Sequence, residues 1–161
     1  MKGRILLAAL AAVLQAVSLG ALAQGRACTL VTPSEVEAAL GFRPAFTPKT
    51  MPGGVELCNS TAGPAWVLIR LFTRTPDKPA MSEQDEMDMI KRSGARVEVR
   101  KHGAIRCMAI VPGGPSAGQK LSTHCTVTKP PMVAVIEVMR PNEPTAIDRL
   151  LPLAEKMMAR F

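Results

Sequence analysis

The stretch that decides the fold is residues 96–140, RVEVRKHGAIRCMAIVPGGPSAGQKLSTHCTVTKPPMVAVIEVMR. It contains four short runs in which apolar residues alternate with polar ones or follow one another closely. Turn sequences separate these runs: Lys101-His102-Gly103, the loop from Pro112 to Lys120, and Lys129-Pro130-Pro131. Short apolar runs bounded by glycine and proline are typical of strands joined by hairpins. Residues 96–140 therefore predict four strands of one antiparallel sheet.

Towards the N-terminus, a short helix is predicted to begin after Thr32. Thr32 suits the N-cap, Pro33 suits the first helical position, and Glu35 completes a capping box. Gly41 is the residue type that commonly ends a helix. The Pro- and Gly-rich stretch from Pro44 to Gly54 then predicts a surface loop.

Two further strands and two further helices complete the prediction. Strands are expected over residues 55–59 and 65–72, and helices over residues 82–93 and 142–161. The helix over 82–93 has acids in its first turn and bases in its last, which suits the helix dipole. In the last helix apolar residues recur at helical spacing, and Pro152 is expected to kink or divide it.

The order of these elements predicts an α+β fold. We expect an antiparallel sheet of five to six strands, with two to three helices packed on one face. Residues 24–161 have the length of one ordinary domain, and no polar linker divides them. They are therefore expected to form a single α+β domain.

The first 23 residues predict a cleaved secretory signal peptide. Lys2 and Arg4 precede the uncharged apolar run from Ile5 to Val17, and Ala21-Leu22-Ala23 offers small residues at the cleavage site. We expect cleavage after Ala23 and a periplasmic or secreted product. No later segment is long and apolar enough to cross a bilayer, so the mature chain is expected to have no transmembrane segment.

The four cysteines predict two disulfides, because exported chains are oxidised. An antiparallel hairpin folded about the loop 112–120 brings residues at equal distances from its centre opposite each other. Cys107 and Cys125 meet this condition, so they should face each other across neighbouring strands. Cys28 is then left to pair with Cys58.

The start of the mature chain carries a recognisable pattern: CTLVTPSEV from Cys28 to Val36, a helix end at Leu40-Gly41, then Cys58 and, in the next strand, Trp66. This pattern resembles a family of small secreted bacterial domains of unknown function, many of them actinobacterial lipoproteins. The resemblance covers the first third of the mature chain. It implies a compact α+β domain with the first cysteine bridged to the second, and it brings no catalytic residues. The lipidation signal of that family is missing here.

Amino-acid composition and net charge indicate which classes of partner the chain is expected to bind. Removal of Lys2 and Arg4 with the signal peptide lowers the net charge from +7 to +5, and a modest positive charge attracts anions such as lipid headgroups. The chain has no Tyr, one Trp and four Phe, so aromatic platforms for stacking bases are scarce. The expected partner is an unknown protein or an anionic envelope surface, and not a nucleic acid.

Basic residues on the first two strands of the four-strand run form a candidate anion-binding face. Arg96, Arg100 and Arg106 are expected on the polar side of these strands, with Lys101 at their turn. The residues expected to face the core are Val97, Val99, Ile105 and Cys107. Glu98 should partly neutralise the basic face, so an ordinary solvated surface is the alternative.

Three methionines are weak candidates for a metal site. Met81, Met87 and Met89 lie on or beside the helix over 82–93, and thioethers can bind Cu(I). The alternative is packing, because Met87 and Ile90 are the apolar residues positioned to bury that helix.

Catalysis has little support in the sequence. His102 is expected at a hairpin tip, and His124 on a strand, facing away from its neighbour Cys125. Acid–base catalysis needs a histidine in a pocket beside a nucleophile, and the cysteines are expected to be bridged. We therefore expect no catalytic residues, no cofactor and no resident metal. The leading hypothesis is a non-catalytic exported binding or cell-envelope accessory domain; periplasmic copper handling and a small hydrolase are the second and third.

Overall fold

The computed structural model of the chain describes residues 25–60, 65–74, 82–111, 120–141 and 144–161. The predicted signal peptide and most of the predicted loop from Pro112 to Lys120 lie outside these residues. The strands are β1 (Thr47–Met51), β2 (Val55–Ser60), β3 (Trp66–Thr73), β4 (Arg96–His102), β5 (Ile105–Val111), β6 (Lys120–Lys129) and β7 (Met132–Pro141). The helices are α2 (Arg26–Thr29), α3 (Pro33–Leu40), α4 (Glu83–Arg92) and α5 (Ile147–Arg160).

The strands form one antiparallel sheet in the order β1-β2-β3-β7-β6-β5-β4. The antiparallel sheet with helices agrees with the predicted α+β class. The expected five to six strands are too few, because the described residues form seven. The additional strand is β1, which occupies part of the predicted loop from Pro44 to Gly54. Its Pro48 is tolerated because β1 is an edge strand, and Gly53 and Gly54 adopt positive φ in the turn that follows.

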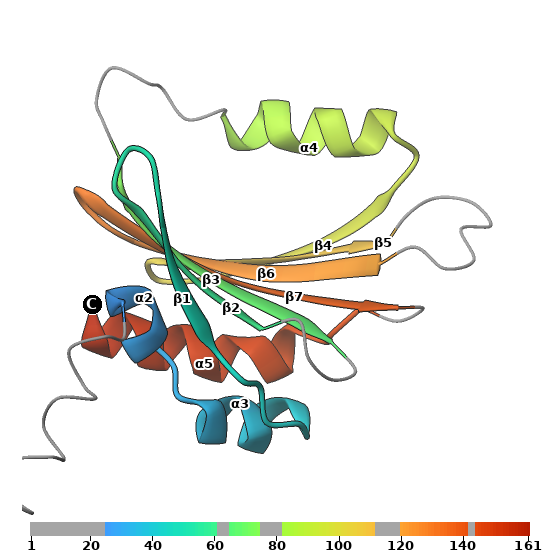
Figure 1. The fold of residues 1–161 in the computed structure, drawn as a ribbon. Helices are drawn as coiled ribbons and strands as arrows, with labels where there is room; N and C mark the ends of the chain where they lie inside the picture. Colours follow the sequence, from blue (N-terminus) through green and yellow to red (C-terminus); the bar gives the residue numbers. More distant parts are fainter. Residues whose placement is uncertain (1–24, 61–64, 75–81, 112–119, 142–143) are drawn as a thin grey trace, which may run out of the picture.

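Helices lie on both faces of the sheet. Figure 1 shows α2, α3 and α5 on one face and α4 on the other. The expectation of helices on a single face is therefore wrong, and the described residues form four helices rather than two or three. The physical reason is that several strands carry apolar residues on both faces, so both faces need cover.

The main core lies between the sheet and the face that carries α5. From β3 it receives Val67, Ile69 and Leu71, which are all at most 1% exposed. The buried residues of α5 that pack there are Ile147, Leu150, Leu153, Ala154 and Met157. Full burial of one large aliphatic side chain contributes about 1.5–3 kcal/mol, so this layer dominates the stability of the fold.

The sequence signals that predicted the start and the end of α3 are confirmed. The Thr32 backbone N–H donates to Glu35 Oε2 at 2.9 Å, and the Glu35 backbone N–H donates to Thr32 Oγ1 at 3.3 Å, which completes the capping box. Gly41 ends α3 with a φ of 78°. Of the two outcomes expected at Pro152, a kink or a division, the division does not occur, because α5 continues unbroken from Ile147 to Arg160. Pro152 lies in the second turn, where its missing N–H removes a single helical hydrogen bond.

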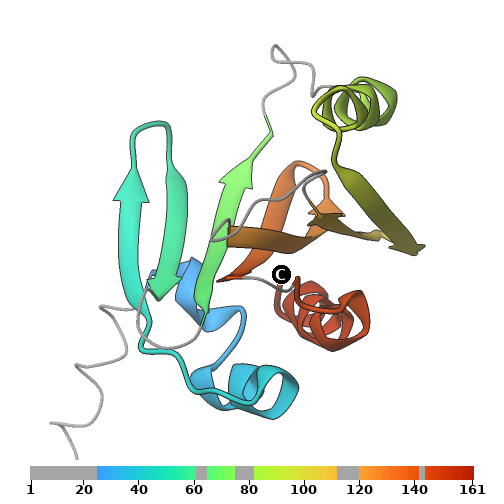
Figure 2. The same ribbon diagram turned by 90° about the vertical axis from the view of Figure 1, so that its right-hand side faces the viewer.

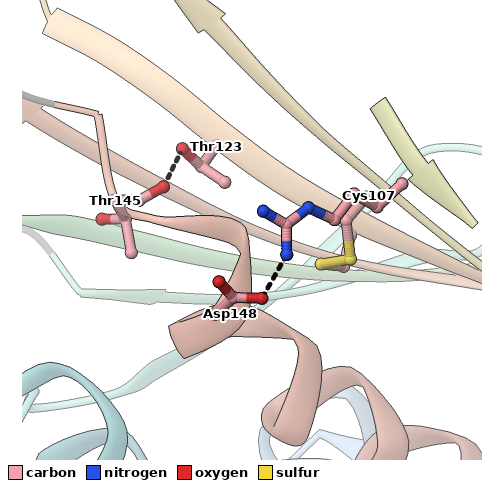
Figure 3. The surroundings of a disulfide bond; sticks show 6 residues. Cys107, Thr123, Thr145 and Asp148 are labelled. Carbon is pink, nitrogen blue, oxygen red and sulfur yellow. Dashed lines mark hydrogen bonds and ion pairs between the residues drawn. A yellow bond between two sulfur atoms is a disulfide. The ribbon is translucent and has the colours of Figure 1, made fainter. Parts of the chain in front are cut away.

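Both predicted disulfides are present, Cys28–Cys58 and Cys107–Cys125. Cys107 and Cys125 are direct partners in the β5–β6 register, as the hairpin argument required. Each bridge closes a loop of moderate length, and the chain-entropy model gives about 3 kcal/mol of stabilisation for each. Figure 3 shows the second bridge beside the start of α5, where Thr123 Oγ1 donates to the carbonyl of Thr145 at 2.6 Å.

Candidate functional site

The face of the sheet that carries α4 is covered by that helix at one edge. Figure 2 shows α4 over the β4 edge, at the opposite side of the sheet from β1 and β2. Three ion pairs hold the helix there: Lys101 Nζ to Glu83 Oε2 at 2.7 Å, Arg106 Nη1 to Glu86 Oε2 at 2.7 Å and Arg106 Nε to Glu83 Oε1 at 3.8 Å. Ile90 is the buried apolar residue of α4. The contact is therefore largely polar and small.

Strand β3 has apolar residues on both of its faces. Its odd-numbered residues from 67 to 71 lie in the main core, whereas Trp66, Leu68, Arg70 and Phe72 point to the other face and are all half-buried. Leu57 of β2 is the direct register partner of Arg70 and is also half-buried. We call Leu57, Trp66, Leu68, Arg70 and Phe72 the β3 patch. None of its members belongs to the main core or to the residues packed against it.

The register shows that the β3 patch shares a face with α4. Arg70 pairs with Val135, Val135 with Thr126, Thr126 with Arg106, and Arg106 with Lys101. Direct partners in an antiparallel sheet point to the same side. Since Arg106 and Lys101 bind α4, Arg70 lies on that side too. The helix that contacts β3, α2, lies on the opposite face.

A polar cluster lies between the β3 patch and α4. Glu137 accepts from Arg70 Nη2 at 3.3 Å and from Ser122 Oγ at 2.8 Å. His124 is the direct register partner of Glu137. Burial lowers the pKa of His124, although the carboxylate of Glu137 acts in the opposite direction. Burial therefore favours the neutral imidazole of His124.

This cluster does not pair a serine hydroxyl with a histidine. A serine nucleophile is commonly activated by a hydrogen bond from its hydroxyl to a histidine base. Ser122 instead donates to Glu137, and no hydrogen bond within the described residues joins it to His124. His102 lies on the other face, with its Nε2 3.8 Å from Glu155 Oε1 of α5. The two histidines therefore belong to different sites.

The predicted basic face is divided between the two sides of the sheet, which corrects the sequence interpretation. Arg100 pairs with Cys107 and therefore shares the α5 side with Arg96, whereas Lys101 pairs with Arg106 on the α4 side. The β4–β5 turn is centred between Gly103 and Ala104 rather than on His102, and such a shift of register changes which residues share a face. The valines of β4, Val97 and Val99, consequently face α4, whereas Ile105 and Cys107 lie in the main core as predicted.

The basic residues are also engaged by acids. Arg100 binds Glu98 and Asp148, and the ion pair with Asp148 lies beside the Cys107–Cys125 bridge. Lys101 and Arg106 bind Glu83 and Glu86, as described above. A continuous anion-binding face formed by these residues gains no support from this arrangement.

The methionines do not converge. Met87 is half-buried and Met89 is 49% exposed. They are two positions apart on α4, and such residues point about 200° apart around a helix. Met81 lies outside the described residues. Within the described parts of the chain, no group of three or more His, Cys, Asp or Glu side chains is placed to bind a metal ion.

The sequence interpretation missed the β3 patch, although a signal for it was present. Residues 65–72 are almost continuously apolar, a pattern typical of a strand covered on both faces. Arg70 is the single charge in that run. An arginine within an otherwise apolar strand indicates that the second face of the strand carries a polar interaction at that position.

Among the helices of the described residues, none combines the length and the apolar character needed to span a membrane. Comparison of the chain with models of protein families, with curated proteins and with solved structures found no match.

Proposed function

We propose that this chain is a non-catalytic exported domain, periplasmic or secreted, that binds a partner through the β3 patch. The observation that carries the proposal is the second apolar face of β3, half-buried and separate from the main core. A role as a binding or cell-envelope accessory domain accounts for such a face, since apolar patches beside polar residues commonly mark interaction sites.

Two features support export. All four cysteines are bridged, and paired cysteines are typical of proteins in oxidising compartments. The first 23 residues have the composition of a signal peptide. The resemblance of the segment from Cys28 to Trp66 to secreted bacterial domains stays a prediction and points the same way.

The β3 patch contains the single tryptophan of the chain, so its occupancy can be measured directly. The neutral apolar dye N-phenyl-1-naphthylamine absorbs where tryptophan emits. We expect the mature domain to bind this dye with quenching of Trp66 emission. Leu68→Asp should weaken binding about tenfold or more, because burial of a leucine contributes about 1.5–3 kcal/mol.

The matched control is Met158→Asp, which alters an exposed apolar residue on the opposite side, on α5. Circular dichroism establishes that each variant is folded. Equal binding by the parent and by Leu68→Asp would contradict the proposal, as would equal losses in both variants.

A further inference from the structure

We propose that the β3 patch binds a small amphipathic carboxylate, with the carboxylate on Arg70 and the apolar body along Leu68 towards Trp66. The inference rests on the proposed function, because it names the ligand class of the same surface.

Arg70 lies in an apolar part of the sheet. Its direct partners on the neighbouring strands are Leu57 and Val135, and its neighbours on the same side of β3 are Leu68 and Phe72. The Arg70 side chain is 40% exposed, so it is accessible from solvent. A cation held among apolar groups attracts an anion more strongly than one on an open surface does.

The guanidinium of Arg70 has N–H donors that lack an acceptor within the described residues. Within the described residues its acceptor is Glu137, through Nη2 at 3.3 Å, and the second oxygen of Glu137 accepts from Ser122. Arg70 Nε is buried without an acceptor within the described residues, so a ligand reaches the guanidinium through its terminal nitrogens, of which Nη1 has no acceptor there and is not among the buried atoms. A guanidinium carries five N–H donors in a planar fork that fits a carboxylate. Arg70 can therefore donate to a second carboxylate beside that of Glu137.

The β3 patch also determines the length of the apolar part of the ligand and the direction in which it runs. Trp66 lies four residues from Arg70 on the same side of β3, which corresponds to about 13 Å along an extended strand. The Trp66 indole N–H donates to Asn59 Oδ1, which orients the ring. A medium-length alkyl chain that starts at Arg70 and crosses Leu68 ends against this ring.

Charge favours a single carboxylate. Lys49 of β1 is the register partner of Leu57, so a second cation lies on the same row as Arg70, and Glu137 is the acid beside Arg70. Phosphates carry more charge and are usually bound by several converging cations or backbone N–H groups. One accessible guanidinium surrounded by leucine, phenylalanine and tryptophan fits a monocarboxylate with an apolar tail.

The test uses the mature, disulfide-bonded domain and two probes of equal chain length, decanoate and decan-1-ol, below their aggregation limits. Trp66 emission reports binding. We expect decanoate to bind at least about tenfold more tightly than the alcohol, because a hydrogen-bonded charge pair forms with Arg70. Arg70→Met should remove this difference, lowering decanoate affinity and leaving decanol affinity unchanged. Arg70→Lys, which keeps the charge without the fork, should retain part of the preference.

Arg149→Met is the control, since Arg149 is an exposed arginine on α5. If Arg70→Met fails to fold, Arg70→Lys decides the question alone. Equal affinity of the parent for the acid and the alcohol, or unchanged decanoate binding in a folded Arg70 variant, would overturn the carboxylate assignment but leave the apolar site intact. Failure of both probes and of the neutral dye would overturn the proposed function itself. Response to anionic phospholipid vesicles without response to decanoate would replace the small ligand by a membrane surface.

Discussion

At the scale of single residues, Glu35 connects three parts of the chain. Its carboxylate accepts from the Thr32 backbone N–H, from Lys156 Nζ at 3.0 Å, and from both terminal nitrogens of Arg160 at 2.7 Å. Arg160 also donates to the carbonyl of Leu30 at 3.0 Å. The guanidinium of Arg160 holds the pKa of Glu35 well below its usual range. The start of α3 and the end of α5 are therefore joined through one side chain.

Glu35→Gln should lower the free energy of unfolding at pH 7 by about 1–2 kcal/mol, discounted for the partial exposure of Arg160. Because the folded-state pKa is depressed, this stabilisation is fully present above the unfolded pKa, about 4.5, and is lost as pH falls below it. The parent should therefore lose stability between about pH 5 and pH 2 more steeply than the variant.

Urea titrations across this range provide the measurement. Glu37→Gln is the control, since Glu37 forms an exposed ion pair with Arg43. Parallel pH curves for the parent and Glu35→Gln would show that Glu35 has no such role.

At the scale of elements, α4 is the least anchored helix of the described fold. Ile90 is its buried residue, and its ion pairs join Glu83 and Glu86 to Lys101 and Arg106. By contrast, α5 buries five residues in the main core. Elements with few buried apolar contacts open at low free-energy cost.

Arg106→Gln should raise amide hydrogen exchange in α4 several-fold while β6 and β7 keep their protection. The reason is that Arg106 binds Glu86 across the α4–sheet contact and lies within 3.8 Å of Glu83. Added salt should raise α4 exchange in the parent, because the exposed Lys101–Glu83 ion pair is screened. Hydrogen exchange with mass spectrometry makes both measurements.

Arg96→Gln is the matched control, as Arg96 lies on the same two-strand hairpin but on the other side of the sheet. An increase in exchange spread equally over α4 and the central strands would mean that the substitution destabilises the whole molecule rather than the helix contact.

At the scale of the whole molecule, we expect export with cleavage after Ala23. The charged start, the apolar run and the Ala21-Leu22-Ala23 site motivate this expectation. Expression of the full chain in a bacterial host, followed by N-terminal sequencing of the exported product, should show Gln24 as the first residue. A lipid-modified or uncleaved product would contradict the expectation.

The sequence alone determined the features that depend on neighbours along the chain. Thr32, Glu35 and Gly41 specify α3, because capping involves groups within one turn of each other. The Cys107–Cys125 pair followed from the symmetry of a single hairpin, and its register has the predicted centre. Helix α4 likewise begins after Ser82, whose hydroxyl accepts from the Asp85 backbone N–H at 3.0 Å.

The tertiary structure decided which side chains share a face and which strands meet. A shift of the β4–β5 turn moved Arg106 to the side opposite Arg100. The pairing of β3 with β7 brought Arg70 beside Glu137, although the two residues are 67 positions apart. The sequence likewise did not indicate the side of the sheet on which α4 lies. The physical reason is that the side-chain period of a strand is two, so faces depend on register, and register between distant strands is set by long-range packing rather than by local propensity.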